Sequence, residues 1–471
     1  MAGLLIPDLL SEIMLRLPPD IQQKFSVAQV SQFWRAVALD TPTFWSSFLG
    51  ATEADSQRLP LVLQRSGSGT LLHVHLHTSD DYWTSKSLLL LLEHANRIET
   101  LYIEFYYAIK RLREGVQALL NSNAEFPVLR HLRLEGSDTS SISVSAPQLR
   151  SLHLEGRGCT LGYWQTSLPP TLESIRLGEA SIEIFLYILS HCPCVQRLVL
   201  HASDPWYDEG RGLLATLRSL PTPPALEEFE LRIWDQDEDD IALLFKAAFS
   251  DVVLRKLTAC IINGHYDSAV EALTSALLVG VGPLTVFKLI DSRDVELHSE
   301  AGHIRHLQCW NDDSFFDVEQ VWRCLSLRYD LHKTVREIRM RPEHWHEYVE
   351  AFERFPPELQ EGLTLGIQTG WEEFPQIMTE EGDMVEASKV MRLPGLSKVK
   401  FYGSQYTTES QFLEIALHAL GIIEPPAGRR VVICVEVSNG AEKLMTTLQS
   451  KLSESSWKIC TECVDHNNAN Y

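Results

Sequence analysis

A short apolar pattern recurs along most of this 471-residue chain and constrains its fold more than any other feature. The pattern is apolar-x-x-apolar-x-apolar, as in residues 129–134 and 149–154. Copies begin at Ile98, Leu129, Leu149, Leu172, Val195, Leu226, Leu254, Leu284, Ile304, Val335 and Leu396. Successive starts are 20 to 31 residues apart, except for a last step of 61, which is about two ordinary steps. Repetition on this scale predicts a stack of similar units rather than one compact core.

The pattern and its spacing resemble leucine-rich repeats, in which each unit is a short strand followed by a return segment. The returns at 181–190, 240–249 and 268–278 carry helix-spaced apolar residues, whereas those after Leu134 and Leu154 leave room only for turns. Strict alternation predicts one more strand at 72–76, before the first counted copy. No copy has the asparagine of a regular repeat, so we expect an irregular α/β arc, with parallel strands on its concave side.

The end of the chain predicts a cap for this stack. Residues 421–430 include Pro425 and Pro426 and should form an exposed connection. A strand at 431–437, a helix at 441–452 and a strand at 457–464 should follow. The expected fold is therefore a repeat solenoid over residues 60–471, preceded by a different N-terminal domain.

The first 50 residues have the pattern of several short helices. Pro7 suits the first turn of a helix, whose apolar positions follow at steps of three and four residues. Pro18 and Pro19 end that helix, Asp20 can cap the next one, and Thr41 with Pro42 repeats this signal. Such a module has too few apolar residues to form a core alone.

The order of these residues resembles the F-box, in the version found in large fungal F-box families. The shared positions are Ile6, Pro7, Leu9, Leu10, Glu12, Ile13, Leu17, Pro18, Val30, Trp34, Arg35, Ala38, Thr41, Pro42, Trp45 and Ser46. The resemblance covers about 45 residues and depends on ordered helix boundaries and two spaced tryptophans. It implies a domain at 1–50 whose helices bind a Skp-type adaptor, as a helix does in an apolar groove.

The resemblance implies that the chain is the substrate-recognition subunit of a cullin ubiquitin ligase, which the adaptor joins to the cullin. The expected adaptor-binding residues are Ile6, Pro7, Leu9, Leu10, Ile13, Leu17, Pro18, Val30, Trp34 and Trp45. From periodicity alone, these residues could instead pack on the domain that follows. A repeat scaffold that directs no ubiquitination is the alternative function, and an enzyme with an unrecognised site is a third.

The repeats also predict a surface for the target protein. Side chains alternate along a strand, so the residue between the last two apolar positions of each copy should point away from the core. Six of these residues are candidate substrate-binding residues: Arg133, His153, Arg176, Lys288, Arg339 and Lys400. They could form a basic stripe suited to an acidic or phosphorylated segment. The alternative is that charged residues merely keep this face solvated.

Composition narrows the class of partner. The formal net charge of −22 and the pI of about 5.2 argue against nucleic acid or an anionic membrane as the general partner. Asp8 and Glu12 interrupt the first apolar stretch, and no apolar run reaches the roughly 18 residues of a membrane span. Nine cysteines without a dense framework fit a reducing compartment. We therefore expect an intracellular protein, cytoplasmic or nuclear.

No catalytic, metal or cofactor motif stands out. Cys460, Cys463 and His466 have half the spacing of a zinc site, but alternating apolar residues favour a terminal strand there. The acidic run at 235–240 fails as a calcium loop, because its sixth position is Asp240 and its twelfth is Lys246. The sequence thus predicts a non-catalytic protein without a cofactor.

Overall fold

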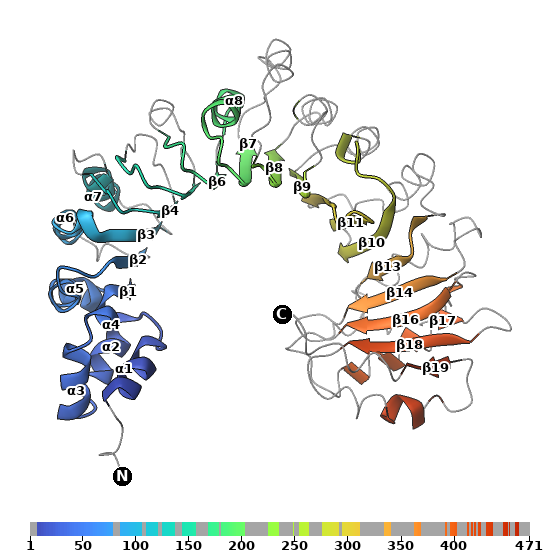
Figure 1. The fold of residues 1–471 in the computed structure, drawn as a ribbon, viewed down its shortest axis with the longest axis horizontal. Helices are drawn as coiled ribbons and strands as arrows, with labels where there is room; N and C mark the ends of the chain where they lie inside the picture. Colours follow the sequence, from blue (N-terminus) through green and yellow to red (C-terminus); the bar gives the residue numbers. More distant parts are fainter. Residues whose placement is uncertain are drawn as a thin grey trace, which may run out of the picture. The chain divides into compact units, whose positions relative to one another are not determined.

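The chain has a mixed α/β fold with a helical N-terminal region and a large, mostly parallel sheet (Figure 1). The structure is a computed structural model. It describes residues 7–78, 85–105, 110–120, 125–136, 144–156, 168–178, 180–202, 225–234, 248, 254–262, 276–291, 294–310, 334–340, 362–368, 391–392, 396–402, 412–413, 416–417, 419–420, 423–424, 430–436, 446–450, 452 and 457–460.

The chain divides into two compact units, Met1–Ile233 and Trp234–Tyr471, called unit 1 and unit 2 below. Unit 1 contains the helical region and the strands up to residue 233. Unit 2 contains the remaining strands. The boundary predicted between residues 50 and 60 lies inside unit 1.

Four short helices form the N-terminal region. They are α1 (Pro7–Leu15), α2 (Ile21–Val27), α3 (Gln32–Leu39) and α4 (Pro42–Ser46). Asp20 caps α2 as predicted, because its Oδ1 accepts a hydrogen bond of 2.8 Å from Gln23 N. Thr41 does not cap α4. Its hydroxyl donates instead to the Val37 carbonyl, 2.8 Å away in the preceding helix.

A strand and a fifth helix join this region to the sheet. Strand β1 (Ser47–Gly50) pairs in parallel with β2 (Leu72–Thr78), and Leu49 N donates to Pro19 O at 2.8 Å. Helix α5 (Glu53–Arg65) lies between these strands and begins with a capping box formed by Thr52 and Asp55. The helical region is therefore tied to the sheet by backbone hydrogen bonds.

The strands of unit 1 follow each other as parallel neighbours from β1 to β8. After β2 they are β3 (Ile98–Phe105), β4 (His131–Glu135), β5 (Ser151–Glu155), β6 (Ser174–Leu177), β7 (Arg197–Ala202) and β8 (Glu228–Trp234). These strands lie at the predicted copies of the pattern, and β2 lies at the predicted extra strand. The helices between them are α6 (Ser85–Leu92), the 3-10 helix η1 (Ala95–Arg97), α7 (Lys110–Leu120) and α8 (Ile182–His191).

The two faces of this sheet differ in character. Helices α5 to α8 lie along one side of the strands in Figure 1. Leucines such as Leu132, Leu134, Leu152 and Leu154 are buried, while the residues that alternate with them are half-buried or exposed. We call the face that carries these alternating polar residues the open face.

Glycines end several strands where two backbones come close. Gly156 follows β5 with φ of +146°, and a Cβ there would lie 1.5 Å from the Gly136 carbonyl oxygen. We therefore expect Gly156→Ala to lower the free energy of unfolding by at least about 2 kcal/mol, because the clash is with backbone. Gly69→Ala is the control, since a Cβ at Gly69 meets nothing within 4 Å. Equal thermal unfolding midpoints for the two variants would contradict this.

Unit 2 continues with mostly parallel strands but in a different order. They are β9 (Lys256–Ile262), β10 (Leu284–Asp291), β11 (Asp294–Ser299), β12 (Ile304–Trp310), β13 (Glu337–Met340), β14 (Leu363–Gln368), β16 (Leu396–Tyr402), β18 (Val431–Glu436) and β19 (Trp457–Ile459). The pairings give the order β9, β12, β11, β10, β13, β14, β16, β18, β19. A separate parallel pair joins β15 (Met391–Arg392) to β17 (Ile423–Glu424).

Two features of this order differ from the sequence prediction. The copy that begins at Leu284 does not pair with the copy before it, because β12 takes the place beside β9. β11 runs antiparallel between β10 and β12. The long step of 61 residues contains β14, which pairs with both β13 and β16, and the short strand β15 of the separate pair.

The described residues cover only part of the predicted cap and helices. β18 and β19 are parallel strands at the predicted positions, and residues 446–450 of the predicted closing helix are helical. The helices predicted at 240–249 and 268–278 lie almost entirely outside the described residues, as does the Cys463 and His466 part of the zinc spacing. Among the helices in the described segments, none has the length and apolar character that a bilayer crossing requires.

Candidate interaction surfaces

The helical region carries an unusual number of exposed apolar side chains. Leu9 and Ile13 lie one turn apart on α1 and are 53% and 40% exposed. Val30 precedes α3 and is 63% exposed, and Phe33 in its first turn is 38% exposed. Helices α1 and α3 pack on each other. We call Leu9, Ile13, Val30 and Phe33 the apolar patch.

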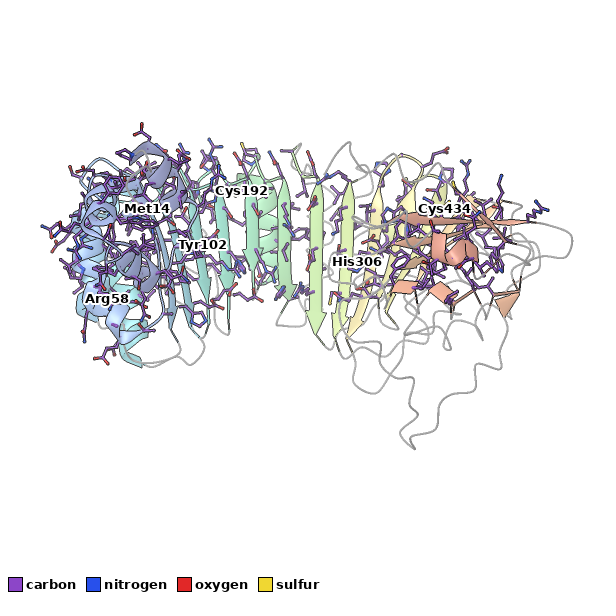
Figure 2. The ribbon with its side chains drawn as sticks, turned by 90° about the horizontal axis from the view of Figure 1, so that it is seen from below. Met14, Arg58, Tyr102, Cys192, His306 and Cys434 are labelled. Carbon is purple, nitrogen blue, oxygen red and sulfur yellow. The ribbon has the colours of Figure 1, made fainter. Side chains whose placement is uncertain are left out.

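Other predicted adaptor-binding residues form the core of this region. Leu10 and Trp45 are fully buried, and Trp45 Nε1 donates to the Ala38 carbonyl at 2.7 Å. The prediction that Leu10 and Trp45 face a partner is therefore wrong for this structure, because their surface is already covered by the helices themselves. Met14, one turn after Leu10, is buried with it among the helices (Figure 2).

The remaining predicted adaptor-binding residues differ in how far they are exposed to solvent. Pro7 and Pro18 are exposed, whereas Leu17 and Trp34 are half-buried. Ile6 lies outside the described residues. Of the predicted set, Leu9, Ile13 and Val30 are thus the apolar side chains most available to a partner.

The predicted substrate residues of unit 1 lie side by side on the open face. The parallel register places Tyr102 beside Arg133, Arg133 beside His153, and His153 beside Arg176. Arg133 also lies over the ring of Tyr102, with 5.8 Å between the guanidinium carbon and the ring centroid. Three of the six substrate-binding residues predicted from the sequence pattern, Arg133, His153 and Arg176, are therefore neighbours in the structure.

Each of these bases has a carboxylate partner. Arg133 Nε donates to Glu135 at 2.6 Å, and His153 Nε2 lies 2.8 Å from Glu155. Arg176 Nε lies 3.3 Å from the same carboxylate of Glu155. The open face of unit 1 is therefore a ladder of alternating charges, and the expectation of a basic stripe is wrong here.

The same arrangement recurs in unit 2. Lys288 Nζ lies 3.3 Å from Glu296, and Arg339 Nε donates to Glu337 at 2.8 Å. Arg339 also lies over the ring of Tyr402, with 4.9 Å to the centroid. Burial alone would raise the pKa of Glu296, but hydrogen bonds and positive charge from His298 and Lys288 outweigh it and lower this pKa to about 2.

Lys400 and Glu337 complete this part of unit 2. The Tyr402 hydroxyl donates to Glu337, and Lys400 Nζ lies 5.7 Å from the Tyr402 ring centroid. The register places Arg339 and Lys400 on either side of Gly366, so the three strands β13, β14 and β16 bring them close. Burial opposes ionisation of Glu337, but its bonds from Arg339 and Tyr402 lower its pKa.

One group of side chains has the composition of a metal site. Ligand atoms of Glu135, His153 and Glu155 lie within 4.8 Å of one another on the open face. Burial lowers the pKa of His153, which favours the neutral ring that a metal needs. However, both carboxylates already hold Arg133 and Arg176, and a metal would have to compete with these cations.

His201 on β7 gives the open face a dependence on pH. Burial, aided by the positive charge of Arg232, lowers the pKa of His201 from 6.5 to about 4. The charges of Arg176, Glu155 and Glu230 also act on this ring. As the pH falls below 6.5, this histidine gains a proton in the unfolded chain, whereas in the folded chain it stays neutral until about pH 4. Protonation therefore favours the unfolded chain, and the free energy of unfolding decreases as the pH falls from 6.5 to 4.

We therefore expect His201→Gln to become more stable relative to the wild type as the pH falls from 6.5 to 4. The change should be about 1 to 2 kcal/mol in the free energy of unfolding, because the ring is only partly buried. Urea unfolding of both proteins at several pH values measures it. Parallel pH curves for the two proteins would show that His201 does not carry this effect.

No protein-family profile matches the chain, and a comparison with curated proteins finds no significant match. The resemblance to F-box proteins therefore depends on the residues quoted above.

Proposed function

We propose that the chain is the substrate-recognition subunit of a Skp–cullin–F-box ubiquitin ligase. In this proposal the helical region binds a Skp-type adaptor, the adaptor joins the chain to a cullin, and the repeat strands hold a target protein. The chain itself performs no chemistry. It supplies proximity, because it holds a target lysine within reach of the conjugating enzyme.

The observation that carries the proposal is the separation of two apolar surfaces on α1. Leu10 and Met14 are buried in the helical region, whereas Leu9 and Ile13 face outward with Val30 and Phe33. Single exposed apolar residues are common, but three on the packed helices α1 and α3 and a fourth just before α3 mark a surface suited to a partner. Helices of an adaptor could cover this patch in the manner of helix-in-groove recognition.

The open face supports target capture of a specific kind. Its arginines are held by carboxylates, so the face presents alternating charges beside the ring of Tyr102. In unit 2, Arg339 is likewise held by Glu337 beside the ring of Tyr402. Charge-paired surfaces of this type contribute mainly to specificity and orientation of a partner. A target with a complementary alternating pattern fits this face better than a purely acidic segment does.

The direct test is purification of the full-length chain from cells that contain a Skp-type adaptor and a cullin. Co-purification of both supports the ligase role, and recovery of neither contradicts it. The half-lives of associated proteins should then be compared in cells with and without the chain. A bound protein whose half-life lengthens on deletion is a target, whereas adaptor binding with no such protein would support the alternative of a scaffold.

The arginines proposed to bind the target protein can be tested separately from adaptor binding. Replacing Arg133, Arg176 and Arg339 with Glu should leave adaptor binding intact and reduce target recovery, because each change puts like charges beside Glu135, Glu155 or Glu337.

The matched control replaces Arg130, Arg150 and Arg336 with Glu. These three arginines are exposed and lie just before β4, β5 and β13. Target recovery should stay near the wild-type level in this control. Equal recovery with both triple variants would place target recognition elsewhere on the chain.

A further inference from the structure

Two arginines of unit 1 lie over one aromatic cluster, and a third binds the end of the helix that carries it. The ring of Phe25 on α2 lies 5.4 Å from that of Trp45, in an edge-to-face arrangement. Arg65 on α5 lies over both rings, with 4.7 Å to the Phe25 centroid and 4.6 Å to the Trp45 centroid. Arg58, labelled in Figure 2, lies two turns earlier on α5. Its guanidinium carbon is 5.3 Å from the Phe25 centroid.

Arg35 on α3 is the third member of this cluster. Its Nε donates to the Ala28 carbonyl at 3.2 Å, which leaves its two Nη groups for other acceptors. Its positive charge is close enough to lower the pKa of Arg65, after the larger effect of burial. Arg35 therefore reaches the end of α2, the helix that packs on both α3 and α5.

These arginines lack the carboxylate partners seen on the open face. Among the described residues, none forms an ion pair with Arg35, Arg58 or Arg65, in a chain with 63 acidic residues. The nearest acidic residue along α5 is Asp55, whose Oδ2 accepts hydrogen bonds from Ala51 N and Thr52 N at 3.1 and 3.0 Å, while its buried Oδ1 bonds to none of the three arginines. Within the described part of unit 1, no ion pair therefore neutralises these three arginines.

One donor in the cluster also lacks an acceptor. Arg58 Nη1 is shielded from solvent and has no hydrogen-bond partner. A buried donor without an acceptor costs about 1 to 3 kcal/mol, and more when the group is charged. The aromatic rings offset part of the repulsion through cation–π contacts, but they supply no oxygen to this N–H.

We propose that Arg35, Arg58 and Arg65 bind a phosphate group of a small soluble molecule. A phosphate carries the missing negative charge, and its oxygens can accept paired hydrogen bonds from guanidinium groups. Phe25 and Trp45 hold the side chain of Arg65 in place before the ligand arrives, which reduces the entropy lost on binding.

The charge of the whole chain favours a small ligand over a membrane. A formal net charge of −22 repels an anionic lipid surface over long distances, whereas three close arginines act on a small anion at short range.

The test is calorimetric titration of the full-length chain with sodium tripolyphosphate at fixed ionic strength. We expect saturable binding with one site for each chain. Arg58→Gln together with Arg65→Gln should weaken it at least about tenfold, since hydrogen bonds to charged groups of this kind are lost. Arg35→Gln, a change at an exposed side chain, should weaken it by a smaller factor without disturbing the fold.

The control variant carries Arg130→Gln and Arg150→Gln, two exposed arginines paired with Glu99 and Glu173. It should bind tripolyphosphate as the wild type does. Absence of saturable binding, or equal binding by Arg35→Gln and the wild type, would overturn the proposal. Binding to phosphatidic acid vesicles without binding of tripolyphosphate would overturn the assignment to a soluble ligand.

Discussion

Replacement of Leu9 and Ile13 with Asp should abolish binding of a Skp-type adaptor to the full-length chain. Both side chains are exposed, so neither change disturbs the core that Leu10 and Met14 form. In the complex, however, each new carboxylate would be buried without a partner, at a cost of several kcal/mol. Co-purification of the adaptor with the double variant measures the effect.

Two other exposed leucines provide the control for this experiment. Leu61 on α5 and Leu89 on α6 are each 44% exposed and lie outside the apolar patch. Their replacement with Asp adds the same charge and should leave adaptor binding unchanged. Recovery of the adaptor at wild-type yield with the Leu9 and Ile13 variant would remove the basis for the proposed F-box function.

Arg97→Met should strongly destabilise unit 1. Arg97 is only 6% exposed, and its guanidinium donates to the Leu63 carbonyl and the Ser66 hydroxyl, each at 3.0 Å, and to the Gly67 carbonyl. These bonds tie the end of α5 to the start of β3. Methionine fills similar space but donates nothing, so the buried acceptors lose their partner, at a total cost of about 3 kcal/mol or more.

Urea unfolding followed by tryptophan fluorescence measures this loss, with Arg130→Met as the matched control. Arg130 makes one surface ion pair with Glu99, and its loss should change the free energy of unfolding by no more than about 1 kcal/mol. Similar midpoints for the two variants would show that the Arg97 hydrogen bonds contribute little to stability.

The positions of most strands could be predicted from the sequence because a leucine at every second residue marks a strand with one buried face. β14 was missed for a simple reason. Its first pattern position is Gln360, which is polar, although Leu363, Leu365 and Ile367 alternate as a strand requires. β11 carried a similar signal in Val295 and Leu297.

The sequence could not show which face of α1 is buried. Leu10 and Met14 form one apolar stripe, and Leu9 and Ile13 form an adjacent one of equal strength. Only the packing of α3 and α4 against α1 decides between them. Periodicity therefore identified the helix, and the resemblance to the F-box assigned Leu10 to the partner together with Leu9 and Ile13.

The charge pairs on the open face could have been found from the sequence. Arg133 and Glu135 are two residues apart, as are His153 and Glu155, and Glu337 and Arg339. Residues at this spacing point to the same face of a strand, so each base was bound to meet a carboxylate. The prediction of a basic stripe considered only one position in each copy and did not consider the residue two positions away on the same face of the strand.

The strand order of unit 2 has a consequence for how the chain acquires its structure. β10 leaves the ribosome before β12, yet β12 must take the place beside β9. Until residues 294–310 emerge, β9 and β10 each have a vacant edge, so we expect direct pairing of β9 with β10 to compete with the native order. The turn at Gly302, with φ of +82°, reverses the chain after β11 and so lets β12 reach the place beside β9.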